Sequence, residues 1–188
     1  MISADRNQRG RGNDMRSTFL RGRSNLGTDL SNDHPVAILY DSGLQTTDQD
    51  LVNPANVDLP LDEGEIQCSS CHDAHDDTIP PFLHKTTLNG ELCTTCHLSA
   101  GRNWDWASSS HAVSNATPQG ANPWPERKPE WAGRNVRENA CMNCHAPHNA
   151  ATPARLITDV EENTCYRCHD GTVAKRDVRG AQKKFFRH

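Results

Sequence analysis

Eight cysteines and four histidines of this chain stand in four copies of the pattern Cys-x-x-Cys-His. In this pattern two thiols can add across the two vinyl groups of a haem, and the histidine can bind the iron from the same side. The two intervening residues match the distance between the vinyl groups, which places the histidine under the centre of the ring. The pattern therefore predicts four covalently attached haem c groups. The predicted attachment residues are Cys68, Cys71, Cys93, Cys96, Cys141, Cys144, Cys165 and Cys168, and the predicted proximal iron ligands are His72, His97, His145 and His169.

Three other uses of these cysteines have to be weighed. Paired Cys-x-x-Cys knuckles also make zinc ribbons, and the gap from Cys71 to Cys93 is close to that spacing. Zinc does not require the histidine, however. With His at 10 of 188 positions, four such coincidences have a chance on the order of one in a hundred thousand. A thioredoxin-like site needs only one such motif in a βαβ context, and four disulfides would leave the histidines unexplained.

The four motifs form an internal repeat. Cys141 lies 73 residues after Cys68, and Cys165 lies 72 residues after Cys93. Each half of the chain is therefore predicted to be a two-haem unit. A further histidine precedes each unit, His34 before the first and His111 before the second.

The sixth ligand of each iron decides between electron transfer and catalysis, because an open iron binds substrates while a filled one only exchanges electrons. His75 and His148 follow the first motif of each unit by three residues, too close to reach the far face of their own haem. We expect each to bind a neighbouring haem. The predicted far-side ligands are His34, His75, His111 and His148.

Two histidines remain. His84 has no counterpart in the second unit, where Leu156 and Ile157 stand, so a surface position is expected. His188 follows the second unit much as His111 follows the first. One hypothesis is that His34 or His188 binds a haem of the next subunit, and the alternative is a frayed chain end at His188.

The composition is poor in core-forming residues. Only 34% of the chain is apolar, 5% is aromatic, and the mean hydropathy is -0.81. Such a chain has difficulty burying enough apolar area to offset its conformational entropy, unless haems supply apolar surface. We therefore predict a haem-organised fold that is mostly irregular coil, with short α-helices around the motifs and little β structure. The apoprotein is expected to be largely unfolded.

The chain divides into five predicted segments. No apolar run is long enough to span a membrane. A secretion signal is expected, because covalent haem attachment takes place outside the cytoplasm, but none can be recognised near Met1. Nucleic-acid binding is not expected, since the basic arm lacks aromatic residues for stacking. The segments are a basic arm (1–25), a first two-haem unit (26–100), a Trp- and Pro-rich connecting loop (101–135), a second two-haem unit (136–174) and a basic tail (175–188).

Charge is distributed unevenly. The arm carries a local charge of +4, the tail +5, and residues 26–174 carry -13. Opposite signs at the ends and the body favour head-to-tail contacts between copies, which form a filament if they do not close into a ring. Arms folded onto their own body would satisfy the same charges.

At these residues the chain resembles the multihaem c-type cytochromes of the doubled Cys-x-x-Cys-His type. The segments around His34 and His111 are similar to that family's distal-ligand segments, although Asp73-Ala74 stands where a proline usually precedes the second histidine. The resemblance implies low-spin bis-histidine haems that pass electrons, at the cell surface, outside the cell or in the periplasm. Some tetrahaem relatives polymerise into extracellular filaments (nanowires) with a haem ligand donated between subunits.

These observations predict a tetrahaem electron carrier rather than an enzyme. Its expected partners are other copies of itself, redox proteins or extracellular acceptors. The alternatives are a soluble periplasmic shuttle, a structural polymer, and a reductase of a small oxyanion, which would need an open haem.

Overall fold

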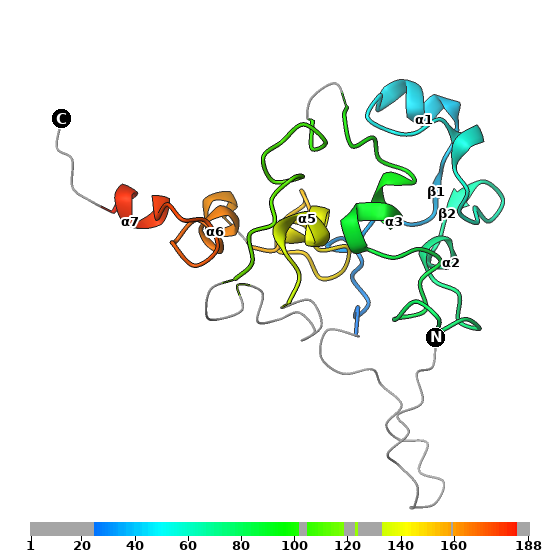
Figure 1. The fold of residues 1–188 in the computed structure, drawn as a ribbon. Helices are drawn as coiled ribbons and strands as arrows, with labels where there is room; N and C mark the ends of the chain where they lie inside the picture. Colours follow the sequence, from blue (N-terminus) through cyan, green and yellow to red (C-terminus); the bar gives the residue numbers. More distant parts are fainter. Residues whose placement is uncertain (1–24, 102–104, 119–122, 124–132, 159, 184–188) are drawn as a thin grey trace, which may run out of the picture.

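The structure is a computed structural model that describes residues 25–101, 105–118, 123, 133–158 and 160–183 (Figure 1). Most of this chain is coil, and no regular element in the described residues exceeds six residues. The predicted fold class is confirmed. The elements are β1 (Ile38–Leu39), α1 (Ser42–Thr47), η2 (Pro54–Asn56), β2 (Glu65–Ile66), α2 (Cys68–Cys71), η3 (Leu88–Gly90), α3 (Glu91–Thr94), α5 (Val136–Asn139), η4 (Ala140–Asn143), α6 (Glu161–Tyr166) and α7 (Val178–Gln182).

The small sheet joins the start of the first unit to its first motif. β1 pairs antiparallel with β2, with Ile38 opposite Ile66. Tyr40 follows β1 and is buried, and its hydroxyl donates to the carbonyl oxygens of Val52 (2.8 Å) and Cys96 (3.0 Å). One side chain thus ties the region before the first motif to the second motif.

The stretch 41–65, which is rich in acidic residues, contains short regular elements. α1 begins after Asp41, whose carboxylate accepts from the backbone N–H of Leu44 (2.8 Å). This is an N-cap, which satisfies a backbone donor at the start of a helix. Asp41, a residue type that is common in turns, here begins a short helix because its carboxylate caps the first helical turn.

The apolar core of the described residues is small. Its members, all at most 9% exposed, are Tyr40, Leu51, Leu59, Val136, Ala140, Met142, Ala146, Ala150 and Val173. A chain with so little buried apolar area needs another source of cohesion.

Segment 31–34 of the first predicted unit lies against residues 147–150 of the second. The backbone N–H of His34 donates to Pro147 (2.6 Å), and that of Ala150 donates to Asn32 (2.9 Å). The guanidinium of Arg155 donates to the carbonyl oxygen of Ser31 (2.9 Å). We call this contact the clamp, and it binds the two units to each other.

Figure 1 shows α2, α3, α5 and α6 following one another across the molecule. In the described part of the chain, no helix has the length and apolarity needed to cross a membrane. The basic arm up to residue 24, Trp104, Trp124, Trp131 and the end of the tail lie outside the described residues.

Candidate haem-binding sites

Each of the four motifs forms a single helical turn. The backbone N–H of the motif histidine donates to the carbonyl oxygen of the first cysteine, four residues earlier, which is the α-helical bond. This bond brings both cysteines and the histidine of a motif onto one short turn. The four lengths are 3.0 Å (His72 to Cys68), 2.9 Å (His97 to Cys93), 2.9 Å (His145 to Cys141) and 3.0 Å (His169 to Cys165).

Side chains at the helix starts hold two of these turns. Before the first motif, Gln67 and Ser70 form a capping box around the start of α2. Before the third motif, Asn135 and Glu138 do the same at α5, with bonds of 2.8 and 2.9 Å. Reciprocal capping satisfies two orphan donors of so short a helix.

The 73-residue repeat recurs in the backbone. After the first and third motifs the chain turns and returns to the motif eleven residues later, so that His72 pairs with Leu83 and His145 with Leu156. The flanking bonds are also equivalent. In the first unit the backbone N–H of Asp73 donates to the carbonyl oxygen of Phe82 (2.8 Å), and that of His84 donates to Cys71 (3.1 Å). In the second unit the equivalent bonds run from Ala146 to Arg155 (2.9 Å) and from Ile157 to Cys144 (3.0 Å).

Six of the predicted iron ligands lie in three ring pairs. Two imidazoles that bind one metal ion from opposite sides, with bonds of about 2 Å, place their ring centres about 6 Å apart. Each pair joins a motif histidine to a predicted far-side histidine and has the spacing that one iron requires. The pairs are His72 with His148 (6.2 Å), His97 with His34 (6.2 Å) and His169 with His111 (6.0 Å).

Hydrogen bonds orient three of these rings. Nδ1 of His72 lies 3.0 Å from the carbonyl oxygen of Pro81, and Nδ1 of His34 lies 3.0 Å from that of Pro35. Nδ1 of His148 lies 3.0 Å from the carboxylate of Asp33. Because these oxygens only accept, Nδ1 must carry the proton, which leaves the lone pair of Nε2 for a metal.

Burial favours the neutral form of several rings. Desolvation lowers the pKa of His34, His72 and His97 below the ordinary histidine value. A neutral imidazole is the form that binds iron, so the environment prepares these rings as ligands.

The other four histidines of the sequence are not members of these three pairs. The side chain of His75 is 96% exposed and contacts the carboxylate of Asp73, whose Oδ1 lies 3.3 Å from Nδ1. His84 is half-buried, and its Nε2 lies 3.1 Å from the carbonyl oxygen of Ser69, so this nitrogen is occupied. His188 lies outside the described residues. His145 is exposed and lies in the third motif.

The cysteines of successive motifs are neighbours. A hydrogen bond with Cys141 raises the pKa of the Cys93 thiol, with smaller contributions from burial and from Cys71, and the same bond lowers the pKa of Cys141 to about 7. Burial and the nearby Cys144 raise the pKa of Cys168 to about 11. Motif one therefore lies near motif two, motif two near three, and motif three near four.

Gly90 permits the close approach of motifs two and three. It is buried, with φ +78°, and an added Cβ would lie 3.2 Å from Sγ of Cys141 and 3.4 Å from Cβ of Ala140. Only glycine adopts this left-handed conformation readily and leaves space for the sulfur.

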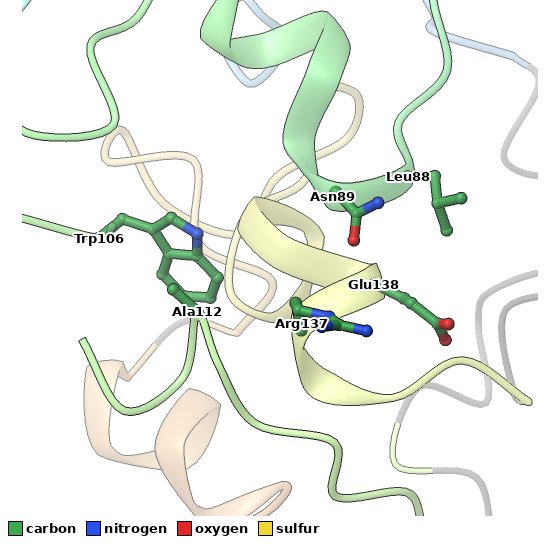
Figure 2. Close-up of a pocket in the computed structure, with 6 residues that line it drawn as sticks. All are labelled: Leu88, Asn89, Trp106, Ala112, Arg137 and Glu138. Carbon is green, nitrogen blue, oxygen red and sulfur yellow. The ribbon is translucent and has the colours of Figure 1, made fainter. Parts of the chain in front are cut away.

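A cavity of ≈ 370 Å³ lies between η3, α5 and the segment 105–118 (Figure 2). Its lining combines the indole of Trp106 with the charged side chains of Arg137 and Glu138. Trp106 also stacks on His111, with ring centres 6.2 Å apart and planes at 10°. This indole therefore lies beside one of the paired histidines.

Sequence reasoning did not assign roles to Asp33 or to the carbonyl groups of Pro35 and Pro81. Asp33 directly precedes a predicted ligand, but nothing in the sequence connects it with His148, 115 residues away. Its carboxylate is 4% exposed and also accepts from the backbone N–H of Asn149 (3.1 Å).

The doubled CXXCH motif family matches this chain twice, at residues 59–102 and 134–174. No curated protein and no solved structure matches it significantly. Within the described residues, no group of three or more His, Cys, Asp or Glu side chains could hold a bare metal ion. The paired histidines fit a haem iron, and the cysteines beside them fit its covalent attachment. The two matches and the four motifs together indicate a multihaem c-type cytochrome that binds haem c covalently and transfers electrons.

Proposed function

We propose that the chain is a tetrahaem cytochrome that conducts electrons along a row of bis-histidine haems. The observation that carries this proposal is the order of the motifs. An added Cβ at Gly90, just before the second motif, would lie 3.2 Å from Sγ of Cys141 in the third motif, and the pKa values of Cys93 and Cys168 are raised in part by cysteines of neighbouring motifs. A row in sequence order provides one path from the first motif to the fourth. The haem supplies reversible one-electron chemistry, and the chain supplies ligands, charge and burial.

The ligand pairs support an electron carrier over a reductase. His72 with His148, His97 with His34, and His169 with His111 would fill both faces of three irons. A filled iron has no coordination position for an oxyanion substrate. Turnover of nitrite or sulfite with a reduced viologen would overturn this part of the proposal.

The chain's own residues would tune these haems. Asp33 places a buried negative charge on Nδ1 of His148, which strengthens that ring as a ligand and stabilises the oxidised, more positive iron. Pro81 and Pro35 offer neutral carbonyls to His72 and His34, which orient the rings without adding charge.

We place the protein outside the cell or at its surface, with the periplasm as the alternative. Covalent haem attachment outside the cytoplasm supports either location. The basic ends and acidic body support head-to-tail association of copies into a conducting filament. Other redox proteins or extracellular acceptors would then complete the path.

Two measurements test the proposal. A pyridine haemochrome assay on intact protein should give four haems per chain. Replacing both attachment cysteines of the second motif, Cys93→Ser with Cys96→Ser, should leave three reducible haems and interrupt current through a protein film. The control is His84→Ala, which changes a histidine outside the proposed ligand set and should keep four haems and the full current. Equal currents from the control and the three-haem variant would contradict conduction along the row.

A further inference from the structure

The two units use their histidines in equivalent ways. His34 leads the first unit and pairs with His97, the second motif histidine of that unit. His111 leads the second unit and pairs with His169, its second motif histidine. The leading histidine therefore serves its own unit in both cases.

The remaining ring pair crosses between the units. His148 follows the first motif of the second unit, and it pairs with His72, in the first motif of the first unit. This histidine thus serves the preceding unit. Its counterpart in the first unit is His75, and no Cys-x-x-Cys-His motif precedes Cys68 in the sequence.

His75 is prepared as a ligand in the same manner as His148. An aspartate carboxylate lies at Nδ1 in both cases, at 3.3 Å for Asp73 with His75 and 3.0 Å for Asp33 with His148. The carboxylate of Asp73 also accepts from the backbone N–H of His75 (2.9 Å), which fixes the ring further. With Nδ1 bound in this way, Nε2 of His75 is directed to solvent on a side chain that is 96% exposed.

We propose that His75 is the sixth ligand of the haem attached through Cys141 and Cys144 in a neighbouring copy of the chain, opposite His145. This inference rests on the proposed function, since it requires the four haems. It names His75 rather than His34 or His188 as the residue that crosses the subunit boundary. His34 pairs within its own chain.

The clamp shows what the interface between copies would contain. Residues 31–34 lie against 147–150 within one chain, and they place His34 beside His148. The equivalent segments are 108–111, which ends at His111, and 74–77, which contains His75. Both segments are exposed, except for partly buried Ser109. Residues 108–111 of one copy would therefore dock on 74–77 of the next.

This relation generates an open chain of copies. The contact that joins the first unit to the second within one chain would also join the second unit to the first unit of the next copy. Repeating one step without closure is a heterologous, head-to-tail assembly. Figure 1 agrees with this arrangement, because α2, just before His75, and α6 lie at opposite sides of the molecule.

The test compares His75→Ala with His84→Ala in the intact holoprotein. His84 is a histidine of the same unit whose Nε2 is already bound to Ser69. Electron micrographs and light scattering give the assembly state, and electron paramagnetic resonance gives the iron spin state. We expect rods with low-spin haems for the unmodified protein and for His84→Ala. For His75→Ala we expect single copies in which about one haem in four is high-spin.

Several outcomes would overturn the inference. They are rods of unchanged length with His75→Ala, or unmodified protein that forms single copies or closed dimers with four low-spin haems. In these cases haem content and reducibility still support the electron carrier. Fewer than four haems per chain would instead remove the proposed function, and the inference with it. Far-UV circular dichroism and haem content of His75→Ala show whether the variant is folded.

Mixing provides a second readout. A His75→Ala copy can still receive a ligand but cannot donate one, so each variant copy ends a chain. With one variant in ten copies, the mean rod length should fall to about ten copies. A rod length that does not change with the variant fraction would contradict the proposal.

Discussion

The loops after the first and third motifs share their hydrogen bonds to the motif but differ in their surroundings. Both return to their motif eleven residues later through equivalent hydrogen bonds. His148 nevertheless lies against a buried aspartate from the clamp, with its side chain 42% exposed, whereas His75 is 96% exposed. The local repeat sets the turn of the chain, and a distant segment sets what each histidine can reach.

The largest effect should come from haem removal, which would abolish the difference between the two loops. We expect apoprotein to lose native far-UV circular dichroism and to show no cooperative thermal transition. The described residues bury only nine apolar side chains, and ligation energy acts here as folding energy. A cooperative transition in apoprotein would show that the polypeptide core is sufficient.

The contact between the units can be weakened at Gly90. Gly90→Ala should lower the free energy of unfolding by about 2–3 kcal/mol, because the new Cβ meets a left-handed backbone and the sulfur of Cys141. Denaturant unfolding followed at the Soret band measures this. Gly27→Ala is the control, since Gly27 has φ +70° with nothing within 4 Å of the added carbon, and it should lose about 1 kcal/mol. Equal losses would mean that the sulfur contact is unimportant.

The two aspartates provide the closest comparison of the loops. Asp33→Asn keeps an acceptor for His148 but removes a buried charge, and it should raise one haem potential by roughly 60 mV, a tenfold change in a one-electron equilibrium. Asp73→Asn should have less than half that effect, because Asp73 is 38% exposed and solvent screens it, against 4% for Asp33. Spectroelectrochemical titration of both variants measures the shifts. A larger shift of the potential for Asp73→Asn than for Asp33→Asn would contradict the expectation that the buried carboxylate has the stronger effect.

The smallest effect concerns Tyr40 in the first unit. Burial, with a further contribution from Cys96, raises the pKa of Tyr40 to about 12, against about 10 in unfolded chains. Its contribution to stability is therefore complete below pH 10 and is lost as the pH rises through about 12. Tyr40→Phe should lower stability by about 1 kcal/mol at neutral pH and flatten the decline above pH 10.

Tyr166→Phe is the control for Tyr40. This substitution also removes a phenol hydroxyl, one that donates to Gln182 in an exposed bond. Thermal melts between pH 8 and about 12 compare the two variants. An identical decline in Tyr40→Phe and unmodified protein would show that other groups cause the alkaline loss.

Residue types and spacing were enough to predict the features that lie within one helical turn or one repeat. Each Cys-x-x-Cys-His turn closes through a bond between residues four apart, and the 73-residue offset of the motifs reappears in the backbone. The low apolar content likewise predicts the coil that the structure shows.

Which histidines face each other depends on long-range packing. His72 and His148 are 76 residues apart in the sequence, and Asp33 reaches His148 across 115 residues. Such partners depend on how the clamp docks one unit on the other. Residue types and their spacing along the chain do not predict that docking. The exposed position of His75 has the same cause, because in the described chain no clamp covers the loop on which it lies.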